Sequence, residues 1–501
     1  MSSNNNIKTI NNHKLKYQTS KMKVPVIFHA SKKLLPDEQT YKQLENLARD
    51  ERLFSHIAAM SDVHPKKGRK NPTGTVVATE KYLLPQINDT APNCGMRFIR
   101  TNFDEKNLTI EKINELFHEL VKVIPTKKYI GTKLSFKDVM NVAKYGSAPL
   151  REKFQTRTKN EIKNTFENGN LITNANITDR DIFDAIPKLF LHIAKYRSGI
   201  LGAAGNHFLD LMKITEIKNS EIAKKFNLKK GQYIFLMHTG SGLLGQYASY
   251  MYTPKTKEHL SQKVILELGL KSWKSKYRKE YLQIAKKIEA YQSRSEFFGY
   301  EDNSTVGKMF LTAHQVSANF GFANRLLLNH HLDQAIEKVF GKSAKLDLLY
   351  DTPHLMVLKE KHFGKNIWVH RNGTVRANGP LRMRGKHQLF SETGEPFFIP
   401  SSMSTPAYLG TGTDKNESSF FSASHGTGRR ARTDDNLPND KQALFKRMEK
   451  NNVRLYNAKS KGVILQDSGY YKDVEEVIDG MEENDIINTV VKMQPVAVLM
   501  Y

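Results

Sequence analysis

The sequence predicts an α+β fold, and its length fits one large domain or two to three ordinary ones. Segments with helical periodicity are interspersed with short β-rich runs, without the regular strand–helix–strand series of a parallel α/β protein. The last third holds several such β-rich runs, which are cut by Gly, Pro and Ser. The chain shows no internal repeat and no heptad array. With 501 residues it can bury a sizeable core.

The expected elements follow in chain order. Residues 1–22 are polar and are expected to be flexible, which leaves 23–501 as the main domain. Helical spacing predicts helices over 36–50, 109–124, 271–293 and 307–338, the second ended by Pro125. The helix over 271–293 is basic and amphipathic and lies in a predicted helical insertion, 271–300. Residues 145–180 are polar and suggest a surface excursion, and "KNIWVH", "PFFIP" and "VAVLMY" predict strands.

Charge and composition narrow the class of protein. Lys and Arg number 77 against 51 acidic residues, a net charge of +26, which favours a polyanionic partner such as nucleic acid. A generally lysine-rich solvated surface explains the same charge equally well. The first residues lack the apolar core of a signal peptide, and no apolar run approaches the roughly 18 residues of a spanning helix. With a single cysteine the chain suits a reducing compartment, so we expect a cytoplasmic protein without a membrane partner.

Several short segments place His, Asp or Cys beside Gly, Ser or Asn. Such pairings are typical of loops in which the backbone approaches a ligand closely. The segments are "SDVHP" (61–65), "NCG" (93–95), "GNHFLD" (205–210), "HTGSG" (238–242), "DTPHL" (351–355) and "SASHGTGRR" (422–430). Thiolate and imidazole ligands suit Zn, Mn, Fe or Co, but no local zinc motif is present, so a metal site would combine distant segments. Taken singly, each His is better explained as a hydrogen-bonded structural residue, and Cys94 as a small buried one.

The segment "HGTGR" has the residues of a phosphate site. Gly426 and Gly428 leave backbone N–H groups free to cradle a phosphate, and Arg429 can neutralise its charge. The imidazole of His425 could then act as a nucleophile. A basic surface turn is the alternative interpretation.

Taken together and in this order, the motifs resemble those of the RtcB family of RNA ligases. The resemblance runs from about residue 55 to the C-terminus. The matching segments are "SDVHP", "NCGMRFIRT", "GNHFLD", "HTGS", "ANR" (323–325), "WVHRNGTVRA" (368–377), "IPSSM" (399–403), "SHGTGR" (424–429) and "YKDVEEVI" (471–478).

The resemblance implies a single α+β domain with a metal-centred cleft. It implies an enzyme that joins RNA ends bearing a 2′,3′-cyclic phosphate or 3′-phosphate to 5′-hydroxyl ends, in RNA repair or tRNA splicing. It further implies GTP and two Mn²⁺ ions as cofactors, and a covalent histidine–GMP intermediate on His425. A monomer is the simplest expectation, and whether an activating protein takes part stays open.

By position, the remaining site residues fall into two groups. The implied metal ligands are Cys94, His207, His238 and His354. The implied nucleotide-binding residues are Asn206, Asp210, Pro400, Ser401, Ser402, Met403, Gly426, Thr427 and Gly428.

The chain departs from the family pattern at several of these positions. Ala91 stands where a metal-binding Asp is usual, and Asp89 or Asp62 is a candidate substitute. Asp210 replaces the more usual Glu. The other departures are Gly242, Leu243, Leu355, Asn372, Ala407 and Met500. Met500 stands where the family has a lysine that contacts guanine, so ATP or another nucleotide is an alternative to GTP.

Two other functions fit the same residues. One is a non-ligating RNA-binding protein that uses a basic cleft and stacks bases on Trp273, Tyr277 and Tyr281. The other is a metal-dependent phosphoesterase that opens cyclic phosphates without ligation.

Overall fold

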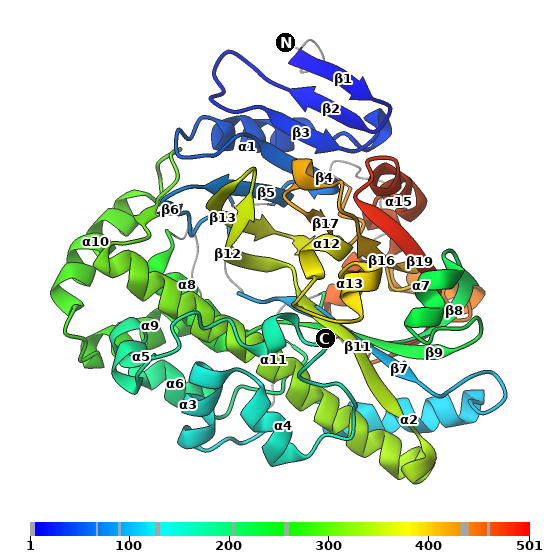
Figure 1. Ribbon diagram of the computed structural model, residues 1–501. Helices are drawn as coiled ribbons and strands as arrows, with labels where there is room; N and C mark the ends of the chain where they lie inside the picture. Colours follow the sequence, from blue (N-terminus) through cyan, green and yellow to red (C-terminus); the bar gives the residue numbers. More distant parts are fainter. Residues whose placement is uncertain are drawn as a thin grey trace.

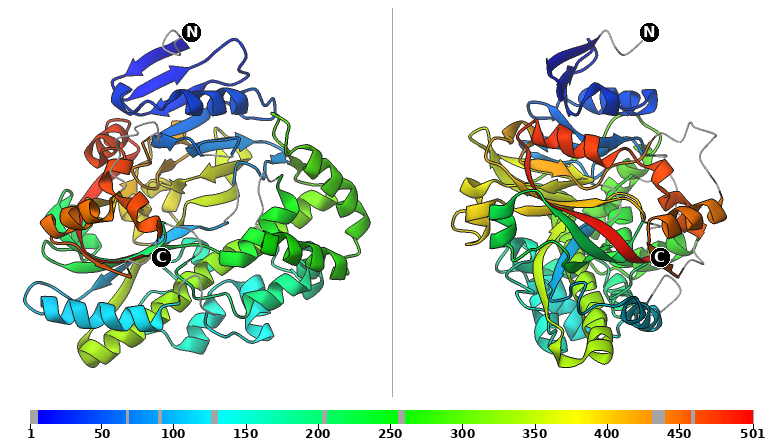
Figure 2. Two further views of the ribbon diagram at one scale, coloured as in Figure 1. Left: turned by 180° about the vertical axis from the view of Figure 1, so that it is seen from behind. Right: turned by 90° about the vertical axis from the view of Figure 1, so that its right-hand side faces the viewer.

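A computed structural model of the chain describes residues 6–66, 69–88, 92–125, 131–202, 206–254, 260–430, 440–457 and 461–500. These residues form one body of mixed helices and sheets (Figure 1), which confirms the α+β prediction. Two large sheets make up its centre, and most of the helices lie along one side and at the edges (Figures 1 and 2). Within the described part, no helix is both long and apolar enough to cross a membrane.

The first sheet contains the N-terminal strands. Its strand order is β1-β2-β3-β4-β5-β13-β12, and all neighbours are antiparallel except β3 and β4. Strands β4 and β5 are buried along almost their whole length, as expected for apolar runs at the centre of a sheet. The bounds are β1 Ile7–Asn11, β2 Lys14–Tyr17, β3 Val26–His29, β4 Ile57–His64, β5 Thr73–Thr79, β12 Leu355–His362 and β13 Lys365–Asn372.

The second sheet carries most of the predicted metal ligands at the ends of its strands. Its order is β11-β7-β9-β8-β19-β16-β15, and β18 pairs with β19 in parallel. The bounds are β7 Gly95–Thr101, β8 Phe208–Ile217, β9 Tyr233–Thr239, β11 Leu346–Pro353, β15 Pro396–Ile399, β16 Ala407–Gly412, β18 Arg454–Tyr456 and β19 Ile487–Met500. Two small sheets pair β6 (Tyr82–Leu83) with β10 (Tyr300–Glu301) and β14 (Thr374–Arg376) with β17 (Ser422–Ser424).

The longest helix, α11 (Thr305–Phe340), runs diagonally along the helical side of the molecule (Figure 1). It is buried over most of its length and packs on α2, α3, α5 and α8, so it ties the helices to the second sheet. The other helices are α1 Glu38–Ala48, α2 Ile110–Val123, α3 Phe136–Tyr145, α4 Ala148–Phe154, α5 Asp179–Ala185, α6 Lys188–Ala194, α7 Ser220–Lys225, α8 Gly242–Tyr252, α9 Leu260–Ser272, α10 Arg278–Ala290, α12 Pro380–Met383, α13 Phe390–Thr393, α14 Lys441–Lys450 and α15 Val474–Glu482. Helices α1, α2 and α11 confirm the predictions over 36–50, 109–124 and 307–338.

Three expectations differ from the structure. The polar N-terminal segment is not loose in its described part, because β1 and β2 extend the first sheet and Leu15 is fully buried. Residues 145–180 are not a surface excursion, because Glu161 is buried in an ion pair with Arg97 and the segment bridges to β11. A polar composition misled the prediction here, since the buried polar groups find partners in one another.

The predicted helix over 271–293 is two helices. It breaks after Ser272, where α9 ends, and resumes with α10 at Arg278. Between them the Trp273 indole turns inward and donates a hydrogen bond to the Phe183 carbonyl (2.8 Å). The Tyr281 hydroxyl is likewise buried and donates to the Met251 carbonyl. Trp273 and Tyr281 therefore belong to the core and are not available to stack on bases, whereas the third predicted ring, Tyr277, is partly buried.

Candidate functional site

Four predicted metal ligands lie at one edge of the second sheet. Cys94 directly precedes β7, His207 directly precedes β8, and His354 directly follows β11. His238 is near the end of β9, opposite Met96 on one side and Phe208 on the other. Because these strands are neighbours, residues far apart in sequence meet at one point.

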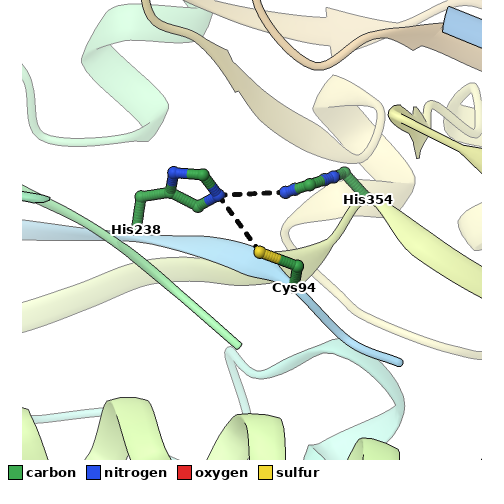
Figure 3. A group of neighbouring side chains, drawn as sticks. All are labelled: Cys94, His238 and His354. Carbon is green, nitrogen blue, oxygen red and sulfur yellow. Dashed lines mark hydrogen bonds between the residues drawn. The ribbon is translucent and has the colours of Figure 1, made fainter. Parts of the chain in front are cut away.

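The side chains converge in the interior. The Cys94 sulfur lies 3.4 Å from His238 Nε2 and 3.5 Å from His207 Nε2. His238 Nε2 lies 3.0 Å from His354 Nε2. Figure 3 shows how Cys94, His238 and His354 point toward one another; their ligand atoms all lie within 4.8 Å.

Backbone carbonyls fix the orientation of two of the rings. His238 Nδ1 is 3.0 Å from the Asn206 carbonyl, and His207 Nδ1 is 3.1 Å from the Leu201 carbonyl. A carbonyl can only accept, so each Nδ1 carries the proton and each Nε2 presents its lone pair to the centre. Two imidazole lone pairs and a sulfur atom therefore converge in a buried space, an arrangement that a metal cation satisfies. The cluster fits a metal ion.

Burial sets the protonation of the cluster. It lowers the pKa of His207 to about 4 and the pKa values of His238 and His354 well below their usual range, so the rings are neutral at pH 7. Burial also raises the pKa of the Cys94 thiol to about 11, opposed by the charge of Arg325. A metal ion that binds here displaces the thiol proton.

Arg325, on α11, links the segments that carry the ligands. Its guanidinium donates to the Asn93 carbonyl (3.1 Å), the Asn93 side-chain oxygen (2.7 Å) and the Thr239 carbonyl (2.8 Å). It also pairs with Asp351 on β11. One fully buried cation thus binds the chain beside Cys94, the chain beside His238 and the strand before His354. The motif "ANR" indicated this position, but the sequence did not reveal its role.

His425 lies next to the cluster and is paired with a carboxylate. Its ring is 4.5 Å, centre to centre, from the ring of His354. Its Nδ1 lies 2.9 Å from Oδ2 of Asp62, at the end of β4, so Nε2 is left with its lone pair. Asp62 is fully buried, and its Oδ1 has no hydrogen-bond partner among the described residues. Asp62 was a candidate substitute metal ligand in the sequence; in the structure it orients His425.

The glycine-rich loop lies directly against β4. Gly428 has φ +70°, and a Cβ there would lie 2.2 Å from the Asp62 carbonyl. Only glycine fits this conformation at this distance, so Gly428 lets the loop pack on the strand that holds Asp62.

A cleft opens beside His425 and His238. Its empty volume, counted with the open mouth, is about 790 Å³. All nine predicted nucleotide-binding residues line it: Asn206, Asp210, Pro400, Ser401, Ser402, Met403, Gly426, Thr427 and Gly428. Part of its wall is polar, and the Ser401 and Thr427 hydroxyls lie 3.1 Å apart.

The cleft also has apolar lining residues. Met96, Met212, Met403, Val498 and Met500 line it together with Asp210. Burial raises the pKa of Asp210 well above its usual range, and its Oδ1 has no partner among the described residues. An unpaired buried carboxyl in a cleft is a group that a ligand can satisfy.

Several departures from the family pattern can be placed in the structure. Ala407 and Met500 line the cleft. Gly242 begins α8 with φ +63°, a left-handed conformation that favours glycine, and the Asn372 side chain donates to the Pro72 carbonyl. Ala91 and Asp89 lie outside the described residues.

Fold and site together define a mixed helix-and-sheet protein with a buried Cys–His cluster, suited to a metal ion, beside a cleft that His238 lines. The chain belongs to the RtcB family, since the family model described as "tRNA-splicing ligase RtcB" matches residues 43–500. Curated relatives carry the same name. The protein of Methanococcus maripaludis is 30% identical over 92% of this chain and 91% of its own, and that of Nanoarchaeum equitans is 28% identical over 96% of each. The protein of Thermococcus kodakarensis is 27% identical over 95% of each.

Proposed function

We propose that the protein is an RNA ligase that joins ends bearing a 2′,3′-cyclic phosphate or 3′-phosphate to 5′-hydroxyl ends, in RNA repair or tRNA splicing. It uses GTP and Mn²⁺ and proceeds through a covalent histidine–GMP intermediate on His425. The family and the names of the relatives support ligation and splicing. The net charge of +26 suits an RNA substrate.

One observation carries the chemistry: the pairing of His425 with Asp62 beside both the cleft and the Cys–His cluster. With its Nδ1 proton held by the carboxylate, His425 offers the Nε2 lone pair as a nucleophile. Attack on the α-phosphorus of GTP forms a P–N bond and releases pyrophosphate. As positive charge develops on the ring, the Asp62 carboxylate stabilises it, as in other histidine–carboxylate pairs.

The later steps move the GMP. The RNA 3′-phosphate takes the GMP from His425, and the 5′-hydroxyl then displaces it to form the phosphodiester. In our proposal, Asn206, Asp210, Pro400 to Met403 and Gly426 to Gly428 bind the nucleotide. In the same proposal, the buried Asp210 carboxyl in the cleft lining binds the base.

Cys94, His207, His238 and His354 would hold the metal. When bound, the ion neutralises charge on the phosphate and on the leaving group. Thiolate and imidazole ligands also suit Zn²⁺, so we propose Mn²⁺ on the strength of the family resemblance alone.

The test is a joining assay that varies the end chemistry. RNA pairs with 3′-phosphate or cyclic phosphate and 5′-hydroxyl ends are compared with pairs bearing 3′-hydroxyl and 5′-phosphate ends, with GTP and Mn²⁺ present. Joining of the first pairs only, lost in His425→Ala and retained in a control with the exposed His118→Gln, is the expected result. Opening of the cyclic phosphate without joining would favour the phosphoesterase instead.

A further inference from the structure

A second hollow lies next to the cleft, at the end of β4. We call it the side pocket. It is bounded by residues 33–37, by the end of β4 and by the start of α15, and its empty volume with the mouth is about 1050 Å³. His64 and Arg429 line both the side pocket and the cleft, so the two hollows meet beside His425.

The charged groups of the side pocket are nearly all committed to other partners. Lys33 pairs with Glu476 (2.7 Å), and the buried Lys472 ammonium donates to three backbone carbonyls at 2.7 to 3.1 Å. Asp37 and Asp473 accept hydrogen bonds from backbone N–H groups at the starts of α1 and α15. What remains of the lining is largely apolar: Leu34, Leu35, Pro36, Val63 and Pro65.

Arg430 is the exception. It lines the side pocket and is exposed, and its guanidinium has no partner among the described residues, whereas the Arg429 guanidinium donates to the Leu465 carbonyl and to the Gln466 side-chain oxygen. Among the residues that the structure describes, the side pocket therefore combines a near-neutral interior with one cation, Arg430, whose guanidinium has no partner. This pattern suits a nucleoside whose next phosphate lies at the mouth.

His64 stands where the two hollows meet, with its proton on a defined nitrogen. Its Nδ1 lies 2.7 Å from the Asp62 carbonyl, which can only accept, so Nδ1 is protonated and Nε2 carries the lone pair. Burial lowers the pKa of His64 to about 4, so the ring is neutral at pH 7. A neutral imidazole in this place can accept a proton from a bound hydroxyl.

We propose that the side pocket receives the terminal nucleoside of the 5′-hydroxyl RNA strand and that His64 accepts the proton of its 5′-hydroxyl. This inference rests on the proposed function. In the joining step the 5′-oxygen forms a bond to the phosphorus of the activated 3′-phosphate. The bond from that phosphorus to the GMP phosphate breaks, GMP leaves with the electron pair, and the hydroxyl proton passes to His64 Nε2.

The chemistry of the two RNA ends assigns them to the two hollows. The 3′ end carries GMP after activation and must occupy the cleft, where His425 and the nucleotide site lie. The 5′-hydroxyl end has no terminal phosphate, so its last nucleoside is uncharged and fits a pocket whose cations are already paired. Its first internucleotide phosphate is then the partner for Arg430.

The test uses the full chain and separates binding from chemistry. A fluorescent 5′-hydroxyl oligonucleotide measures binding by anisotropy, without GTP. A second RNA strand, whose 3′-phosphate already carries GMP, measures the joining step alone in a single turnover. Both are applied to the wild type, His64→Gln, Arg430→Ala and the control His118→Gln, with melting temperatures to confirm folding.

For Arg430→Ala we expect binding about tenfold weaker and a shallower salt dependence, by about one unit of slope. For His64→Gln we expect joining at saturating acceptor to fall about 10²-fold, with oligonucleotide binding within twofold of wild type. Unchanged binding in Arg430→Ala, or unchanged joining in His64→Gln, would overturn the proposal. If the wild type formed no His425 adduct with GTP, the proposed function would fail, while the anisotropy measurement would still decide whether the side pocket binds the RNA end.

Discussion

Two parts of the site are built on opposite principles. In the Cys–His cluster, His207 and His238 are held by backbone carbonyls, and the segments around Cys94 and His238 are tied to one buried arginine. Around Asp210, a carboxyl oxygen without a partner among the described residues lies in the same cleft lining as flexible methionines. The first part is fixed before any ligand arrives, whereas the second is left for the ligand to complete. We therefore expect chemistry that needs exact placement at the cluster, and recognition around Asp210.

The largest effect should follow from loss of the sulfur in the Cys–His cluster. Cys94→Ala removes the atom on which His207 and His238 converge. We expect loss of bound metal and of the His425 adduct by more than about 10³-fold, because a metal site that lacks one of its ligands binds weakly. Metal content by mass spectrometry and adduct formation by intact mass would measure this. Full activity in Cys94→Ala would show that the cluster does not need its sulfur, and would remove the distinction between the cluster and the lining around Asp210.

Asp62→Asn tests the orientation of His425 without changing any of the proposed metal ligands. An amide facing Nδ1 allows the other tautomer, in which Nε2 carries the proton and cannot attack. The rate of adduct formation should fall about 10³-fold, with the metal content unchanged. Asp485→Asn, an exposed carboxylate, serves as the control. A normal rate in Asp62→Asn would show that the carboxylate does not orient the ring.

Three buried histidines outside the cleft make the stability of the protein depend on pH. Burial lowers the pKa of His29 and His370 to about 3 and of His314 to about 4. The unfolded chain binds protons at these rings below about pH 6.5 while the folded protein does not, so stability is complete above pH 6.5 and falls as pH drops toward 4. Each ring should remove about 2 kcal/mol from the free energy of unfolding between pH 7 and pH 5.

Urea denaturation at the two pH values measures this loss. His314→Gln should show a smaller pH dependence than wild type, whereas His118→Gln, on the surface, should not. An identical pH dependence in His314→Gln and wild type would show that the buried ring is not kept neutral.

The smallest effect is expected in the cleft lining around Asp210. Asp210→Ala should raise the GTP concentration for half-maximal adduct formation about tenfold, which corresponds to one lost hydrogen bond, and leave the maximal rate nearly unchanged. Met500→Leu, which keeps an apolar side chain of similar volume, should stay within twofold. A fall in the maximal rate of Asp210→Ala would instead place that carboxyl in the chemistry.

The sequence predicted the parts of the site but not their pairing. Cys94, His207, His238 and His354 stand in short loop motifs, and the order of those motifs identified them together. The bond between His425 and Asp62 joins residues 363 positions apart, and no local pattern encodes it. Without the fold, Asp62 could be taken only as a spare metal ligand.

The elements were predictable where one apolar face repeats. Helices α1, α2 and α11 have such a face, and their positions were close to the prediction. Polar composition failed as a guide to exposure, because Glu161 and Arg97 are fully buried as a pair. The prediction of one helix with exposed aromatic rings over 271–293 failed for another reason. Trp273 faces the core, and the helix breaks beside it.

The measurement that tests the central claim most directly is the intact mass of the protein after incubation with Mn²⁺ and GTP, with ATP in parallel and His425→Ala as the control. We predict a gain equal to one GMP, absent from the control. A gain of AMP instead would support the histidine nucleophile but show that the nucleotide site accepts adenine and not guanine. No adduct with either nucleotide would contradict the assignment of His425 as the nucleophile.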